Sequence, residues 1–149
     1  MTQTNAFSEL AGKKLGPTPW LELTQDRVTA FGGVTLDFDP HHIDPRQAKN
    51  GPFGVAVAQG FLTLSLLTHF VEKLPGNTMP EQNVNYGFNK VRFIKPAMVG
   101  SKLRAYFTCV GAEQRAPGQH LMTFETIIES DADGGTPVLA AEWLTLVYA

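Results

Sequence analysis

The chain has 149 residues, of which 43% are hydrophobic and 17% are charged, and its formal net charge is −2. This length and composition predict one globular domain with its own core, and they argue against intrinsic disorder. So small a net charge creates no field that would attract nucleic acid or a membrane surface. We therefore expect neither nucleic acid nor membrane as a partner.

Cysteine usage and hydropathy indicate a cytoplasmic protein. Cys109 is the single cysteine, so the chain forms no internal disulfide and suits a reducing compartment. Residues 1–15 lack a basic run followed by an apolar core, so we expect no signal peptide. No apolar stretch approaches the roughly 20 residues that a membrane helix needs.

The beginning of the chain predicts an arm followed by a helix. Residues 1–14 are polar and small, and we expect them to precede one domain that spans residues 15–149. Thr24 is a good N-cap for a helix that runs through Asp26 to Phe31. The pair Gly32–Gly33 should end this helix.

Residues 37–44, Asp-Phe-Asp-Pro-His-His-Ile-Asp, gather two of the four histidines of the chain beside three aspartates. A carboxylate and an imidazole held close together can position one water and move its protons in both directions. Pro40 disfavours helix at Asp39, which predicts a shaped loop and not a helical turn. An exposed turn is the alternative for this segment. A metal site has the right residue types but lacks His-x3-His or Cys-x2-Cys spacing, so we expect no metal.

Two helices are predicted next. Asp44 is expected to be the N-cap and Pro45 the first residue of a short helix, which should end at Gly51–Pro52. Residues 61–74 then form a helix of about four turns, closed by Pro75–Gly76. Its apolar residues fall on nearly every side, which is typical of a buried helix that other elements wrap.

The rest of the chain predicts an antiparallel sheet that could wrap this helix. Apolar and polar residues alternate over 84–93, with a change of parity near Gly87 that indicates a β-bulge. Further strands are expected at 102–109, 122–128 and 138–148, with turns at 116–118 and 133–135. Helices followed by a run of antiparallel strands predict an α+β fold.

With these elements placed, the sequence resembles the MaoC-like dehydratases, which include the (R)-specific enoyl-CoA hydratases and the NodN-like proteins. The resemblance extends from about residue 15 to residue 148. Residues 37–42 resemble the Asp-x4-His hydratase motif, and residues 51–54 with 57–63 resemble the loop that enters the long helix. Residues 85–93 resemble the following strand, particularly that of NodN-like members.

The resemblance implies a hot-dog fold, a homodimer, and an acyl-CoA substrate that needs no further cofactor. It implies hydration of trans-2-enoyl-CoA to (R)-3-hydroxyacyl-CoA, or the reverse dehydration, with Asp37 and His42 as the catalytic pair. It also implies that the Gly60 N–H points at the thioester oxygen. This has a physical basis, because a helix start offers free N–H groups where the enolate charge develops.

Two positions depart from the family pattern. Gln59 stands where members often have histidine, and we expect it to support the substrate site through its amide. His41 stands where an aliphatic residue is frequent, and it could compete with His42. Phe61, with Phe38 and Phe53, is expected to line the acyl pocket.

Lys90, Arg92 and Lys95 belong to a stretch of five basic residues without an acidic one, between Glu81 and Glu113. They suit the phosphates of coenzyme A, although they also suit the solvent face of strands. Cys109 is expected to be a packed thiol, and His69 and His120 are expected to be structural.

Two other functions stay open for this chain. The first is a hot-dog thioesterase, which would release a free thiol. The second is a non-catalytic subunit that binds an acyl thioester without turnover.

Overall fold

The computed structural model describes residues 9–75 and 82–148. Two short strands, β1 (Lys14–Leu15) and β2 (Leu21–Glu22), precede the helices α2 (Gln25–Thr35), α3 (Pro40–Ile43), α4 (Pro45–Lys49) and α5 (Gly60–Glu72). The long strands β3 (Asn83–Phe93), β4 (Lys102–Ala116), β5 (Gln119–Ser130) and β6 (Thr136–Tyr148) follow, with the short helix η1 (Ala132–Gly134) before β6. Within the described residues, no helix is long and apolar enough to cross a membrane.

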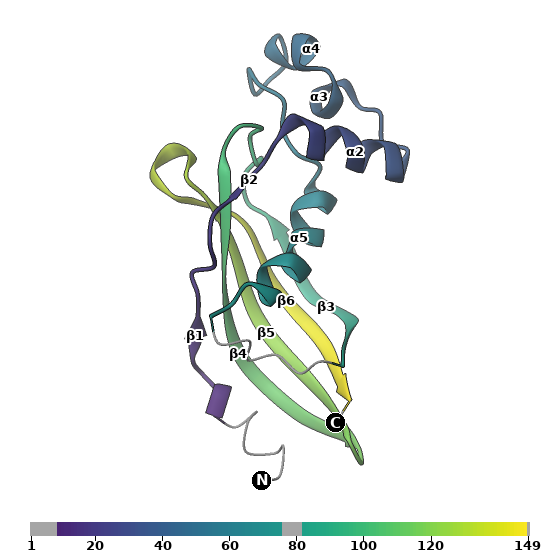
Figure 1. Cartoon of the computed structure of the whole chain (residues 1–149), viewed down its shortest axis with the longest axis vertical. Helices are drawn as coiled ribbons and strands as arrows, with labels where there is room; N and C mark the ends of the chain where they lie inside the picture. The colour runs from purple at the N-terminus through teal and green to yellow at the C-terminus, as the bar shows by residue number, and fades with distance from the viewer. Residues whose placement is uncertain (1–8, 76–81, 149) are drawn as a thin grey trace.

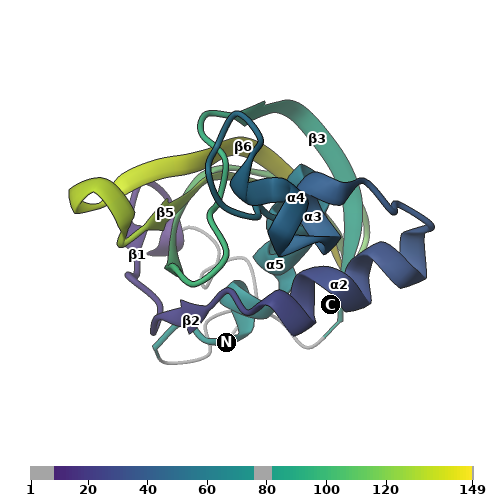
Figure 2. The same ribbon diagram turned by 90° about the horizontal axis from the view of Figure 1, so that it is seen from above.

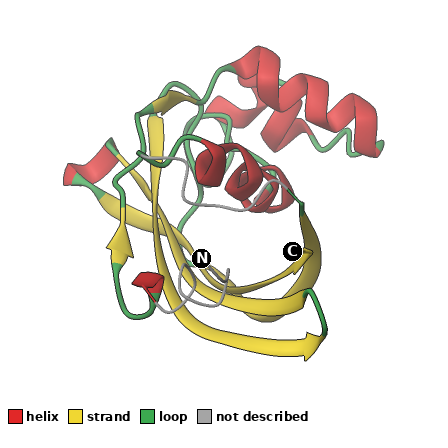
Figure 3. Ribbon diagram, turned by 60° about the horizontal axis from the view of Figure 1, so that its bottom comes forward, coloured by secondary structure: helices red, strands yellow, loops and turns green. Residues whose placement is uncertain are grey.

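The strands form one antiparallel sheet in the order β1-β4-β5-β6-β3, and β2 also pairs with β4. The sheet curves around α5, while α2, α3 and α4 gather at one end of that helix (Figures 1 and 3). This arrangement confirms the predicted α+β class and the hot-dog topology of a helix wrapped by a sheet. The placement of a boundary between arm and domain at residue 15 stays a prediction.

The core lies between α5 and the inner face of the sheet. Leu103, Ala105, Phe107 and Cys109 alternate inward along β4 and are all buried, as their spacing predicted. The bulge near Gly87 is confirmed by a register shift between Asn85 and Gly87 against β6. A second shift follows between Phe88 and Lys90, and the sequence did not indicate it.

The helix α5 is wrapped on one side only. Its buried residues are Leu62, Thr63, Leu66, Leu67, Phe70 and Val71. Phe61, Ser65 and Thr68 lie on the other side and are exposed in the single chain. The expectation of a helix buried all round was therefore wrong for one chain, because the sheet covers only the face that points into its curve. Gly76, the second residue of the predicted stop, lies outside the described residues.

The helix α2 begins as predicted and ends later. The Thr24 side chain accepts a hydrogen bond from the Arg27 N–H, so the N-cap is confirmed. The expected end at Gly32–Gly33 was wrong, because the helix continues to Thr35. Gly32 allows the backbone of Asp37 to approach α2 closely, since a Cβ at Gly32 would lie 2.7 Å from the Asp37 carbonyl oxygen.

Residues 37–44 are more helical than the sequence predicted. The expectation of a loop without a helical turn was wrong, because Pro40–Ile43 forms one short helix. Pro40 occupies the first turn, where its missing N–H is not needed, and Asp39 is the extended N-cap. Asp44 caps α4 as predicted, by accepting from the N–H groups of Arg46 and Gln47.

Candidate active site

The turn of α3 is attached to the segment before α5 through Val57. The His42 Nδ1–H donates to the Val57 carbonyl at 2.7 Å, and the Val57 N–H donates to the His41 carbonyl at 3.1 Å. Because Val57 is buried, these two bonds fix the turn against the body of the domain. The bond from the His42 ring also sets the tautomer of the neutral imidazole, since a proton on Nδ1 leaves the lone pair on Nε2.

Asp37 and His42 face each other across a short gap. The His42 Nε2 lies 3.9 Å from the Asp37 Oδ2, which is too long for a direct hydrogen bond. One water about 2.8 Å from both atoms would bridge them. The His42 side chain is 19% exposed and that of Asp37 is 43% exposed, so the gap is open to solvent or substrate.

A tight turn at the end of α2 brings Asp37 to this position. Leu36 has a φ of 61°, in the left-handed region that bulky residues rarely adopt. The turn lets the Asp37 N–H donate to the Gly32 carbonyl at 3.0 Å. The Asp37 Oδ1 then accepts from the Asp39 N–H at 3.2 Å, which leaves Oδ2 toward His42.

A cavity of about 340 Å³ lies beside this pair, and we call it the α5 cavity. Four of the residues singled out in the sequence line it: His42, Phe53, Gly60 and Lys95. The α2–α4 helices lie over the same end of α5 when the molecule is seen from above (Figure 2). The complete lining is His42, Phe53, Val57, Ala58, Gly60, Thr63, Phe93, Lys95, Pro96, Ala97 and Val138.

The N-terminus of α5 opens into the α5 cavity. Among the residues that the structure describes, neither the Gly60 N–H nor the Phe61 N–H donates a hydrogen bond. A Cβ on Gly60 would lie 3.0 Å from the ring of Phe93. Glycine therefore leaves the N-terminus of α5 without a side chain, so the free N–H donors at the positive end of the helix dipole stay accessible.

His41 faces away from the gap between Asp37 and His42. Its Nδ1 lies 2.8 Å from the Asp39 Oδ1, and its ring lies against Gly51. Hydrogen bonds from His41, first from its backbone N–H and then from its ring, hold the pKa of the Asp39 carboxyl below its ordinary value. Asp39 and His41 thus form a second exposed pair beside Asp37 and His42.

Gln59 and the phenylalanines occupy different places. Gln59 is 2% exposed, and its amide donates to the Val28 carbonyl while its Oε1 has no partner among the described residues. Phe53 lines the α5 cavity. Phe61 is 69% exposed and meets Phe93 edge-on, so it borders the cavity without lining it. Phe38 is also exposed.

The three expected phosphate contacts do not lie together. Lys95 lines the α5 cavity, whereas Lys90 and Arg92 line a separate depression on the outer face of the sheet. The two basic residues on β3 alternate with the inward-facing Val91, and Lys95 lies beyond the end of the strand. Strand alternation therefore divides a run that looked continuous in the sequence.

Gln25 was missed in the sequence although it contacts the site. Its amide donates to the His42 carbonyl at 2.8 Å and to the Thr29 hydroxyl at 3.2 Å, which ties α2 to the turn of α3. No sequence signal could have found this contact, because the partners are 17 residues apart. Within the described residues, no group of three or more histidine, cysteine or acidic side chains could hold a metal ion.

Comparison with known proteins assigns the chain to a family. The family model described as "MaoC like domain" matches residues 6–131. The chain belongs to the MaoC-like dehydratase domain family. The hot-dog architecture is thus that of a family member.

Curated relatives cover most of the chain. It is 38% identical over 132 residues to 3-hydroxyacyl-thioester dehydratase Z of Mycobacterium tuberculosis, covering 89% of this chain and 87% of the relative. It is 33% identical over 141 residues to nodulation protein N of Rhizobium meliloti, covering 93% and 87%. The solved (R)-hydratase of A. caviae superposes with a TM-score of 0.74 at 22% identity, covering 91% and 94%, and shows the shared fold.

Proposed function

We propose that this protein hydrates trans-2-enoyl-CoA to (R)-3-hydroxyacyl-CoA, or catalyses the reverse dehydration. The observation that carries the proposal is the gap of 3.9 Å between the His42 Nε2 and the Asp37 Oδ2, beside free N–H groups at the start of α5. The relatives named as a 3-hydroxyacyl-thioester dehydratase and an (R)-specific enoyl-CoA hydratase support the reaction class.

Asp37 and His42 would hold the attacking water. The water donates one hydrogen to the His42 Nε2 and the other to the Asp37 carboxylate, which leaves an oxygen lone pair free to attack C3. One O–H bond breaks as the C3–O bond forms, and the pair takes that proton. C2 then receives a proton from the pair, so the pair ends with the protons with which it began.

The N–H of Gly60 would stabilise the charge that this attack produces. As oxygen adds to C3, negative charge develops on the thioester oxygen as an enolate. A donor aimed at that oxygen stabilises the transition state more than the ground state. Gln59 would support the same end of α5, because its backbone carbonyl accepts from the N–H groups of Leu62 and Thr63.

Lys95 is the basic residue that we assign to the phosphates of coenzyme A, because it lines the same cavity as His42. An ammonium group there would attract the phosphates of the carrier.

We further propose a homodimer. A second chain could cover the exposed side of α5 around Phe61, and among the described strands the long edge strand β3 is paired on one side only.

The two pairs in residues 37–42 provide a matched test of the hydratase. Asp37→Asn and His42→Ala should each lower the hydration of crotonyl-CoA by about 10²–10⁴-fold, followed as loss of enoyl-thioester absorbance. In Asp37→Asn the carboxylate that accepts the second hydrogen of the water is lost, while the side chain keeps its size and shape. Asp39→Asn and His41→Ala are the controls, and each should stay within a fewfold of the wild type.

Circular dichroism of all four variants checks that the fold survives. Full turnover by a folded Asp37→Asn protein would refute the catalytic assignment. Release of free thiol would instead indicate the thioesterase. Calorimetric binding of crotonyl-CoA and of longer enoyl-CoA substrates without turnover would indicate the non-catalytic subunit.

A further inference from the structure

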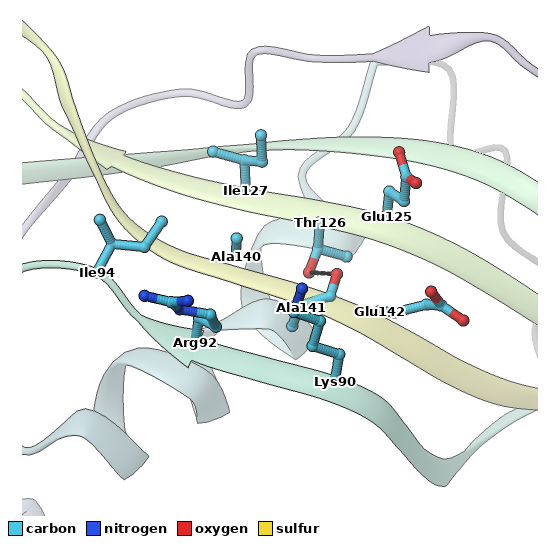
Figure 4. Close-up of a pocket in the computed structure, with 9 residues that line it drawn as sticks. All are labelled: Lys90, Arg92, Ile94, Glu125, Thr126, Ile127, Ala140, Ala141 and Glu142. Atoms are coloured by element: carbon cyan, nitrogen blue, oxygen red, sulfur yellow. Dashed lines mark hydrogen bonds between the residues drawn. The ribbon is translucent and has the colours of Figure 1, made fainter.

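The outer face of the sheet carries a depression of about 560 Å³, whose lining residues are drawn in Figure 4. We call it the outer-face patch. Side chains of β3, β5 and β6 line it, and β6 runs between the other two strands. The patch and the α5 cavity have no lining residue in common, and none of Asp37, His42 and Gly60 lines the patch.

The charges of the patch are separated by strand. Glu125 on β5, Glu142 on β6 and Lys90 on β3 lie in one row of the sheet. Ile127 on β5, Ala140 on β6 and Arg92 on β3 form the next row. The β3 side of the patch is therefore basic, and the β5 side carries a carboxylate beside an isoleucine.

Ion pairs within the part of the chain that the structure describes do not neutralise these charges. Among the described residues, Lys90, Arg92 and Glu125 form no ion pair, whereas Arg104 and Glu129 pair on the same face of β4 and β5. Glu125 lies directly opposite Glu142, and like charges in that position destabilise a sheet. A partner that supplies cations over β5 would relieve this repulsion.

Apolar groups lie between the charges. Ile94 is 44% exposed and Ile127 is 39% exposed, and Ala140 separates them with a small side chain. A small residue at the centre of a sheet face lets another sheet approach closely. An anionic ligand would meet two carboxylates in this patch, and a cationic ligand would meet Lys90 and Arg92.

We propose that the outer-face patch binds the same patch of a second copy of this chain, with β3 of each copy over β5 of the other. In this arrangement Lys90 of each copy lies over Glu125 of the other, and Arg92 lies over Ile127 in the next row, beside that carboxylate. Two cations and two carboxylates from each copy leave the interface neutral. The two Glu142 side chains approach near the two-fold axis, each beside Lys90 and the Asn89 amide that it accepts from.

This surface is distinct from the α5 side proposed for the homodimer, so the two together make a tetramer. The test measures solution mass by light scattering after gel filtration and by sedimentation, at low salt. Glu125→Lys and Lys90→Glu should each halve the mass of the wild-type assembly. The double variant Glu125→Lys/Lys90→Glu should restore it, because the charges are exchanged and remain complementary.

Lys102→Glu is the matched control, since it makes the same charge change at an exposed position of β4 outside the patch. It should leave the mass unchanged. A halving from dimer to monomer would support this interface while refuting the α5 homodimer, and a halving from tetramer to dimer would support both. Masses that the single charge changes do not alter, or a double variant that stays dissociated, would overturn the proposal.

Discussion

Replacing Gly60 by alanine tests whether the start of α5 must be narrow for the substrate. The new Cβ would lie 3.0 Å from Cε1 and 3.1 Å from Cδ1 of the Phe93 ring, so the ring must move by a few tenths of an ångström. Phe93 is half exposed and can move. We therefore expect the free energy of unfolding to change by less than about 1 kcal/mol.

The same substitution should reduce catalysis strongly. A methyl group at the mouth of the α5 cavity moves the thioester away from the free N–H groups, and a displacement of about 1 Å can cost 10²-fold. We expect kcat/KM for crotonyl-CoA to fall about 100-fold, which corresponds to ~2.7 kcal/mol of transition-state stabilisation. Initial rates of hydration measure the first quantity, and urea unfolding measures the stability.

Gly33→Ala is the matched control for this experiment. Its Cβ would meet no atom within 4 Å, and Gly33 lies inside α2, so the variant should gain about 0.5–1 kcal/mol and keep full activity. A Gly60→Ala protein as active as Gly33→Ala would refute the argument that the substrate approaches the backbone at Gly60. If the Gly60→Ala protein is inactive and also strongly destabilised, the loss of activity would come from disrupted packing.

Two further predictions concern residues around the site and the core. Gln25→Leu removes the donor to the His42 carbonyl, so kcat should fall about tenfold while KM changes little. Steady-state kinetics on crotonyl-CoA measures both constants. An unchanged kcat would show that the bonds to Val57 are sufficient to hold the turn of α3. Burial raises the pKa of the Cys109 thiol, so this cysteine should react with an aromatic disulfide reagent at pH 8 only when the protein unfolds. Rapid labelling of the native protein would contradict the inward placement of Cys109.

Local patterns in the sequence predicted much of the secondary structure because they report on short-range physics. The Thr24 and Asp44 caps were predicted because their side chains bind N–H groups two or three residues away. The inward face of β4 was predicted because strand side chains alternate. The two failures near Gly32 and Pro40 share one cause, since contacts made by the folded turn decided both the end of α2 and the form of α3.

Only part of the candidate site could be predicted from the sequence. The sequence places Asp37 and His42 in one short polar segment, and the family resemblance implies that they act as a pair, but the sequence left His41 as a competitor of His42. The choice between the two histidines depends on distant contacts, because the Val57 carbonyl holds the ring of His42 and Asp39 holds the ring of His41. The separation of Lys95 from Lys90 and Arg92 likewise needed the two faces of the sheet.

The sequence by itself determined the α+β class, the polar segment from Asp37 to His42 and the long apolar helix, because each depends on residue type and short spacing. Its resemblance to known proteins indicated the family. The tertiary structure alone decided which face of α5 stays exposed, that Gln25 supports His42, and that Glu125 and Lys90 share one outer surface. These features join residues far apart in the chain. Only the closing of the sheet around α5 brings such residues together, and no local pattern carries that information.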